Sequence, residues 1–187
     1  MLLEPKLVKQ MVKETEEMRK KIQNSGENLL ESEYIYTSKV KARQVEKMQI
    51  EISTANHKVI VDEPKPFGKD EGASPIDLLL AAYAGCFQIT LIFLSCASNL
   101  DVEDIKVEIS AQMDARDGFR GPKSPPPRIK SMKILTIFKT SEPEKKIQRI
   151  IRKAKHDCSV GGSLHPDIKK EYILEIVPMS QNSEKEE

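Results

Sequence analysis

Three cysteines carry the clearest potential for chemistry in this sequence. Cys86 and Cys158 both lie in apolar segments with helical spacing, and Cys96 follows Cys86 by ten residues. Packing of two helices can bring core-directed cysteines within disulfide distance, which makes Cys86 and Cys158 a candidate redox couple. Cys96 lies about 80° around the helix from Cys86, so we interpret it as a packing residue. The alternative for all three is the role of a small buried hydrophobic side chain.

The segment around Cys86 is uncharged from Leu78 to Leu100. Such a stretch is long enough to cross a membrane. Its polar side chains, and the lack of a directly flanking basic cluster, favour instead a core helix that its own protein buries on most sides. Ser74 and Pro75 are typical of the cap and first turn of such a helix, and Gly85 suggests that another group approaches it closely.

The segment that leads to Cys158 predicts a second helix. Residues 141–144, Ser-Glu-Pro-Glu, have the spacing of a capping box. Apolar residues follow on one face, so the Cys158 thiol is expected to point toward the core; they are Ile147, Ile150, Ile151 and Ala154. The Gly161-Gly162 pair is expected to end the helix.

Alternating and β-branched runs predict the strands around these helices. Two or three strands fall within residues 33–62, and runs at 105–112 and 129–139 predict a hairpin with a long proline-rich tip. Residues 172–177 predict a last strand. Residues 5–23 predict an amphipathic helix that packs on the domain or on a partner subunit.

The composition fits one globular domain with an appended arm. The 187 residues are 39% apolar and 32% charged, and the net charge of +1 lacks the basic excess of a nucleic-acid or anionic-membrane binder. Few cysteines and no apolar leader favour a reducing cytoplasm. The expected parts are a helical arm (1–30), a folded domain (31–178) and a disordered polar tail (179–187).

Two histidines near Cys158 raise the question of a metal site. Neither His156 nor His165 belongs to a close Cys-x-x-Cys or His-x-x-x-His pair of the kind typical of zinc sites, so we expect no metal. His156 is expected to face solvent.

Two motifs together resemble one known family. The sequence SPIDLLLAAYAGCF at 74–87, followed by HDCSVGGSL at 156–164, is similar to the OsmC/Ohr family of osmotically inducible and organic-hydroperoxide-resistance proteins. The resemblance covers residues 34–177. It implies an α+β fold of antiparallel sheets with a long buried central helix and a second helix. It also implies an intertwined homodimer with active sites at the interface.

The resemblance implies reduction of organic hydroperoxides by a cysteine pair. Cys86 would attack the terminal oxygen of the peroxide and become a sulfenic acid, and Cys158 would resolve it as a disulfide. An external dithiol would reopen the disulfide, so no cofactor is needed. The apolar side chains of Tyr83 and Phe87 are the candidate pocket for an alkyl chain.

The sequence departs from the family where the thiol is activated. Burial disfavours a thiolate, so a cation must lie near Cys86; in the family it is an arginine of the first strands, held by a glutamate directly after the proline. Here that position is Ile76, and the acid comes one residue later as Asp77, as in one branch of the family. Arg43 is the best match for the arginine, and Arg128 is the second choice.

The departure at Ile76 leaves two hypotheses for function. The first is a thiol-dependent hydroperoxide reductase. The alternative is a non-enzymatic binder of a small apolar or electrophilic ligand, which keeps the fold and the cysteines. Turnover of an organic hydroperoxide separates the two.

Overall fold

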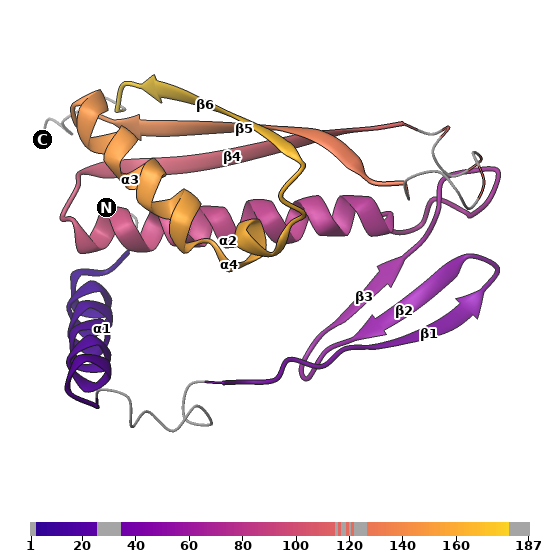
Figure 1. Cartoon of the computed structure of the whole chain (residues 1–187), viewed down its shortest axis with the longest axis horizontal. Coiled ribbons are helices and arrows are strands. Elements are labelled where there is room, and N and C mark those ends of the chain that lie inside the picture. The colour runs from indigo at the N-terminus through magenta and orange to yellow at the C-terminus, as the bar shows by residue number, and fades with distance from the viewer. Residues whose placement is uncertain are drawn as a thin grey trace, which may run out of the picture. The chain divides into compact units, whose positions relative to one another are not determined.

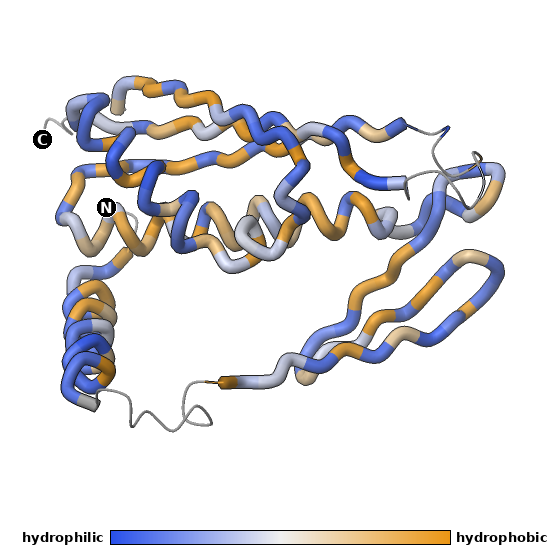
Figure 2. The backbone as a smooth tube through the Cα atoms, viewed as in Figure 1, coloured by the Kyte–Doolittle hydropathy of each residue, from blue (hydrophilic) through white to orange (hydrophobic). Residues whose placement is uncertain are grey.

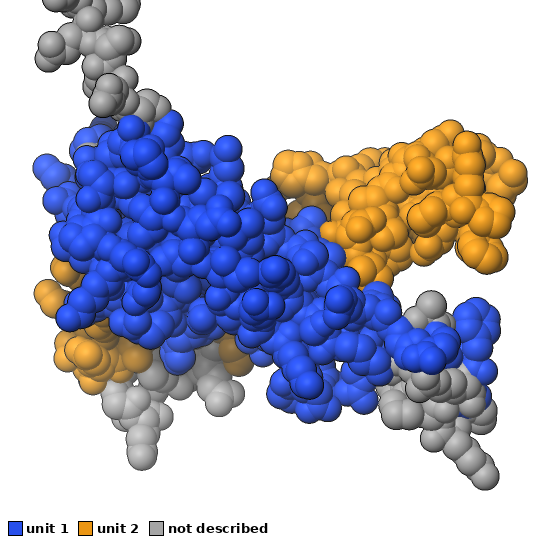
Figure 3. Space-filling model, turned by 90° about the horizontal axis from the view of Figure 1, so that it is seen from above, with its two compact units in different colours: residues 1–10, 80–187 blue, residues 11–79 orange. Residues whose placement is uncertain are grey.

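The computed structural model describes residues 3–25, 35–114, 116, 119, 121 and 127–179. The chain divides into two compact units, one of residues 1–10 and 80–187 and one of residues 11–79 (Figure 3). Two helices belong partly to each unit: α1 (Pro5–Ser25) and α2 (Pro75–Ala97). Each unit contains one three-stranded sheet.

The unit of residues 11–79 contains three short antiparallel strands. They are β1 (Lys41–Glu46), β2 (Gln49–Ser53) and β3 (Lys58–Val61), hydrogen-bonded in chain order. The turn after β1 holds Lys47 in the left-handed backbone region, with a φ of 50°. The Gln44 side chain donates a hydrogen bond of 2.7 Å to the carbonyl oxygen of Lys47. These strands confirm the prediction for residues 33–62.

A buried carboxylate organises the loop that follows β3. Asp62 is 1% exposed and accepts hydrogen bonds from three backbone N–H groups; the donors are Glu63 (2.8 Å), Lys69 (3.1 Å) and Glu71 (3.3 Å). Burial by itself raises the pKa of the Asp62 carboxyl, but the three donors outweigh it and hold the pKa below its ordinary value. The loop is therefore closed around an ionised side chain.

The unit of residues 80–187 is built on a mixed sheet of order β4-β5-β6. The antiparallel hairpin of β4 (Val102–Met113) and β5 (Ile129–Thr140) confirms the predicted one, whereas β6 (Lys169–Val177) pairs with β5 in parallel. A parallel neighbour requires a crossover connection, and α3 (Glu144–Asp157) with α4 (Ser159–Ser163) supplies it (Figure 1). The resemblance implied antiparallel sheets, but this sheet contains one parallel pair of strands.

One face of this sheet and one stripe each of α2 and α3 form the core. Met132, Ile134 and Phe138 are buried at alternate positions along β5. Figure 2 shows the apolar stretches along the strands and α2. Burying one such side chain contributes about 1.5–3 kcal/mol, so the cluster dominates the stability of this unit. The helices contribute Tyr83, Phe87, Leu91 and Leu94 from α2, and Ile147, Ile150, Ile151 and Ala154 from α3.

The helix α2 is not buried on most sides, contrary to expectation. Its buried residues form a single stripe, and Ile89 on another side is 69% exposed. A Cβ at Gly85 would meet nothing within 4 Å, so the expected close approach is absent from the described part of the chain. Among the described residues, α2 is the one helix with the length and composition of a membrane span. Its buried stripe nevertheless belongs to the core of the unit.

The second predicted helix differs from expectation at both ends. Pro143 precedes α3 without any side-chain cap, so the predicted capping box is wrong. The Glu142 carboxylate instead accepts a hydrogen bond from the backbone N–H of Asp101 at 3.1 Å. The helix ends at Asp157 rather than at the glycine pair, because Cys158 adopts an extended conformation. The last strand begins at Lys169, before the expected start.

The predicted N-terminal helix is confirmed as α1. It extends two residues beyond the expected end at residue 23. Residues 180–187 of the predicted polar tail lie outside the described residues. The proline-rich loop between β4 and β5 is described only in part.

Replacing Asp62 by Asn should open the loop after β3. The Asn amide places an N–H donor against backbone donors, so amide hydrogen exchange at Lys69 and Glu71 should become faster at pH 6. In the unmodified protein the Asp62 pKa is lowered on folding, so its stabilising contribution is complete above about pH 4 and is lost as the pH falls through the folded value. NMR titration of the carboxyl carbon measures this directly. The control is Asp70→Asn, an exposed position of the same loop.

Candidate functional site

The structure brings Cys86 and Cys158 together within one unit. Cys86 is partly exposed on α2, and Cys158 is 1% exposed between α3 and α4; both are free thiols. Cys158 belongs to the core cluster against which Cys86 packs, and Cys86 is near enough to raise the pKa of the Cys158 thiol. Redox chemistry between them therefore requires no rearrangement of distant elements.

A break between two helices positions Cys158. Its backbone N–H still donates to the Ala154 carbonyl at 3.0 Å, but its extended φ and ψ of −75° and 105° end α3. The thiol then accepts a hydrogen bond of 3.4 Å from the backbone N–H of Gly161 and acts as the N-cap of α4. The side chain is thereby held facing the core instead of following the surface of a continuous helix.

The surroundings of Cys158 keep its thiol protonated. Burial is the largest cause and raises the pKa of Cys158 above its ordinary value. The N–H groups of Gly161 and Val160 act in the opposite direction, but the neighbouring Cys86 adds to the increase. A protonated thiol is a poor nucleophile toward peroxide, which suits a residue that reacts only after its neighbour has been oxidised.

Gly161 is packed against both the thiol and an aromatic ring. A Cβ at this position would lie 2.7 Å from Cε2 of Tyr83, 3.3 Å from its Cζ and 3.4 Å from Sγ of Cys158. Only a residue without a side chain fits without displacing Tyr83 or the thiol. Gly162, the next residue, has nothing within 4 Å of a Cβ. The two glycines of the motif therefore have different roles.

Three aromatic rings line the inner side of the thiol pair. The ring centroids of Tyr83 and Phe87 lie 6.1 Å apart, and those of Phe87 and Tyr172 lie 6.0 Å apart. The hydroxyls of Tyr83 and Tyr172 share a hydrogen bond of 2.8 Å. Tyr83 and Phe87 are fully buried in the core, so their predicted role as a substrate pocket stays a prediction. The alternation of apolar residues along the last strand could have identified Tyr172 as inward-facing, but nothing in the sequence identifies its hydrogen-bonding partner.

Two lysines bring positive charge to these rings. The Lys155 ammonium lies 3.7 Å from the ring centroid of Tyr172, and burial lowers the pKa of Lys155. The Lys170 ammonium lies 5.9 Å from the Tyr83 ring centroid and donates a hydrogen bond of 2.9 Å to the carbonyl oxygen of Gly161. No local feature of the sequence marks either residue, because lysines interleaved with apolar positions are typical of a solvated face.

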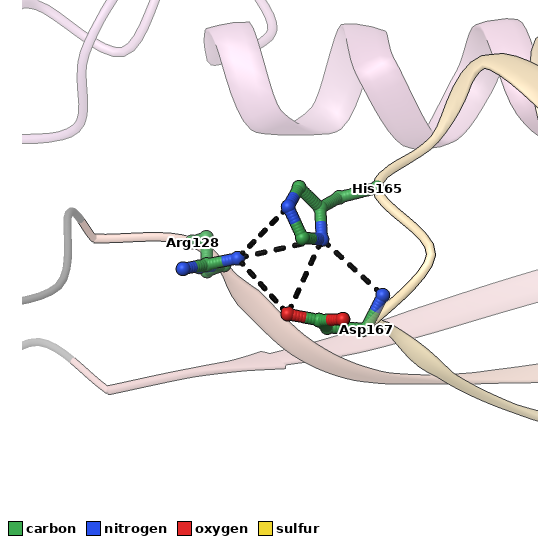
Figure 4. A network of polar contacts seen from close by, with 3 residues as sticks. All are labelled: Arg128, His165 and Asp167. Carbon is green, nitrogen blue, oxygen red and sulfur yellow. Dashed lines mark hydrogen bonds and ion pairs between the residues drawn. The ribbon is translucent and has the colours of Figure 1, made fainter.

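The two candidate arginines are engaged elsewhere. Arg128 donates to the His165 ring at 3.1 and 3.3 Å and forms a 3.5 Å ion pair with Asp167 (Figure 4). Arg43 lies in the unit of residues 11–79, where it forms an ion pair of 3.4 Å with Glu51. The assignment of either one as the group that activates Cys86 stays a prediction.

Asp77 has a structural partner at the start of α2. Its carboxylate accepts hydrogen bonds from the Ser74 hydroxyl (2.7 Å) and backbone N–H (3.1 Å), and its own N–H donates to the Ser74 hydroxyl at 3.2 Å. These reciprocal bonds are a capping box, and they lower the pKa of Asp77. The predicted start of α2 at this cap is confirmed. A role of Asp77 in holding an arginine stays a prediction.

The remaining candidate residues lie away from the thiol pair. Cys96 is partly buried near the N-terminal residues, in a small pocket of about 110 Å³, and burial raises its pKa. Ten helical residues separate it from Cys86 by about 15 Å of rise. The side chain of His156 is 89% exposed, as expected, and lies 2.8 Å from Asp157.

Comparison with known proteins identifies the family. A family model described as OsmC-like protein matches residues 68–172, more than half of the chain. The chain therefore belongs to the OsmC-like family, which confirms the resemblance carried by the two cysteine motifs. No curated protein matches the chain.

Solved structures from three bacteria share the fold. A Psychrobacter arcticus protein, described as an osmotic stress induced and detoxification response protein, is 26% identical, with a TM-score of 0.60 and coverage of 75% of this chain and 96% of that chain. The Mycoplasma pneumoniae OsmC-like protein is 15% identical (TM-score 0.66; coverage 76% and 98%). The organic hydroperoxide resistance protein OhrB of Bacillus subtilis is 21% identical (TM-score 0.55; coverage 75% and 98%). The α+β fold is therefore that of the OsmC and Ohr proteins.

Replacing Gly161 by Ala should destabilise the thiol site. The new Cβ would push against the Tyr83 ring and Cys158, and overpacking of this kind costs about 1–3 kcal/mol of unfolding free energy. Gly162→Ala is the matched control and should leave stability unchanged or slightly higher. Urea unfolding of the two variants measures the difference. Equal stabilities would show that the close packing at Gly161 is absent in solution.

Proposed function

We propose that this protein reduces organic hydroperoxides with Cys86 as the peroxidatic residue and Cys158 as the resolving residue. The observation that carries the proposal is the placement of both thiols in one core cluster, near enough for Cys86 to affect the pKa of Cys158. Membership in the OsmC-like family supports a peroxide-related redox role. The matched structures include one whose name refers to organic hydroperoxide resistance.

The difference in exposure supports the proposed roles of the two cysteines. Cys86 is partly exposed and can meet a substrate, whereas Cys158 is buried and held protonated. The Cys86 thiolate attacks the terminal peroxide oxygen, the O–O bond breaks, and the alkoxide leaves as an alcohol after taking a proton. Cys158 then attacks the sulfenic sulfur, and a disulfide and water form. An external dithiol returns both cysteines to thiols by two exchange steps and leaves as a disulfide.

A second candidate function is non-enzymatic binding of a small apolar or electrophilic ligand. Two observations favour it: Ile76 replaces the family's glutamate, and the Asp77 carboxylate caps α2. Under this hypothesis Cys86 would react once with an electrophile or not at all. Multiple turnover distinguishes the two functions.

The unmodified protein should consume cumene hydroperoxide in multiple turnovers with dithiothreitol, after correction for the uncatalysed reaction. Cys86→Ser should abolish the catalysed rate. Cys158→Ser should form one equivalent of sulfenic acid but prevent the Cys86–Cys158 disulfide, which peptide mapping without reductant detects. Cys96→Ser is the matched control and should retain the full rate. Undiminished turnover by Cys86→Ser would refute the enzyme hypothesis.

We further propose that the protein forms a homodimer through α2. Four residues of this helix, spaced by three or four, present an exposed apolar stripe; they are Leu79, Ala82, Gly85 and Ile89. Removing such a stripe from water favours association, and a twofold interface lets the same stripe pack against itself. Gly85, which nothing approaches within the described chain, would then have close contact with the second copy.

Ile89→Glu should convert the dimer into a monomer, because it would place a charge in the apolar stripe that the interface buries. Light scattering should show twice 21.2 kDa for the unmodified protein and 21.2 kDa for the variant. The control is Val177→Glu, at the exposed end of β6, which should stay dimeric. An unmodified protein that is monomeric at micromolar concentration would contradict the proposal.

A further inference from the structure

A pair of tyrosine hydroxyls lies behind the thiol pair. Tyr83 precedes Cys86 by three residues, so both side chains lie on neighbouring positions of one face of α2. The Tyr83 ring and Sγ of Cys158 both pack against Gly161. A Cβ at Gly161 would lie 2.7 Å from Cε2 of Tyr83 and 3.4 Å from Sγ of Cys158. The two thiols are among the neighbours that raise the pKa of Tyr83. Its hydrogen-bonding partner is the Tyr172 hydroxyl, 2.8 Å away.

The charge distribution favours one direction for this hydrogen bond. The Lys155 ammonium, 3.7 Å from the Tyr172 ring centroid, stabilises negative charge on that ring and therefore favours Tyr172 as the donor of the pair. Burial acts on Tyr83 in the opposite way and raises its pKa far above the ordinary value, with further contributions from Tyr172 and the two thiols. When Tyr172 donates to Tyr83, the Tyr83 O–H is available to another acceptor. The thiol pair is its neighbour.

Peroxide cleavage in a buried site has a need that this hydroxyl can meet. Thiolate attack on a hydroperoxide expels an alkoxide, which is strongly basic and poorly solvated among apolar side chains. A positioned proton donor typically accelerates such a step by about 10²–10⁴-fold. The donor must be protonated and buried, and Tyr83 is both.

We propose that the Tyr83 hydroxyl donates the proton to the departing alkoxide and that Tyr172 positions it. The proposal rests on the peroxidase function inferred above. In this step the Cys86 thiolate forms the S–O bond, the O–O bond breaks, and the alkoxide takes the Tyr83 proton to give the alcohol. Sulfur is oxidised by two electrons and the peroxide is reduced by two. Tyr83 recovers its proton from Tyr172, which is reprotonated by solvent on the Lys155 side.

The test separates proton donation from thiol reactivity. In full-length Cys158→Ser protein, Cys86 is reacted with cumene hydroperoxide or with iodoacetamide, and its peptide is followed by mass spectrometry. Both reagents need the thiolate, but iodide leaves without a proton. Tyr83→Phe should lower the peroxide rate by about 100-fold or more and leave alkylation within about twofold. Tyr172→Phe should lower the peroxide rate less, by about tenfold, and also spare alkylation. The control Tyr36→Phe, at a residue 85% exposed, should change neither rate.

Each other outcome has a definite meaning. An undiminished peroxide rate in Tyr83→Phe, or an equal fall in both reactions, overturns the proposal. If Tyr83→Phe does not fold, Tyr172→Phe decides, and an unchanged peroxide rate in that variant overturns the relay. If the Cys158→Ser protein forms no sulfenic acid at all, the peroxidase function itself fails and the proton-donor role fails with it.

Discussion

The unit of residues 80–187 depends on one interaction. An apolar stripe of α2 packs against the β4-β5-β6 sheet and α3. Tyr83, Phe87 and Leu91 fix the rotation of the helix about its axis, because only this stripe is buried. That rotation places Cys86 at the edge of the core, partly exposed and beside Cys158. The position of Cys86 therefore follows from hydrophobic burial of this stripe and from the spacing that a helix imposes.

Burial creates an electrostatic difficulty that polar groups around the thiols partly offset. A dry surrounding favours neutral thiols, and it does so for Cys158, whose pKa is raised. The structure supplies an N–H donor from Gly161, a pair of phenols and two lysines, Lys155 and Lys170, at the outer side of the rings. The result is a buried thiol with a raised pKa beside a more exposed one.

The departure of this chain from its family is concentrated at the start of α2. An acid two residues after Pro75 closes a capping box with Ser74, so its carboxylate stabilises the helix start. Ile76, at the position of the family's glutamate, cannot hold a guanidinium group. Arg43 and Arg128 each have acidic partners of their own, Glu51 and Asp167. The proposed proton donation from Tyr83 requires neither arginine.

The sequence alone determined the elements and the candidate cysteines, because local rules govern them. Alternation predicted β4 and β5, helical periodicity predicted α1 and α3, and the cap at Ser74 predicted where α2 begins. Other features depend on contacts between residues far apart in the chain. The break at Cys158, the parallel pairing of β6 and the Tyr83–Tyr172 hydrogen bond arise only when α4 and β6 pack against α2. Backbone conformation at a single cysteine, and a hydroxyl pair 89 residues apart, have no local signature, so only the tertiary structure decided them.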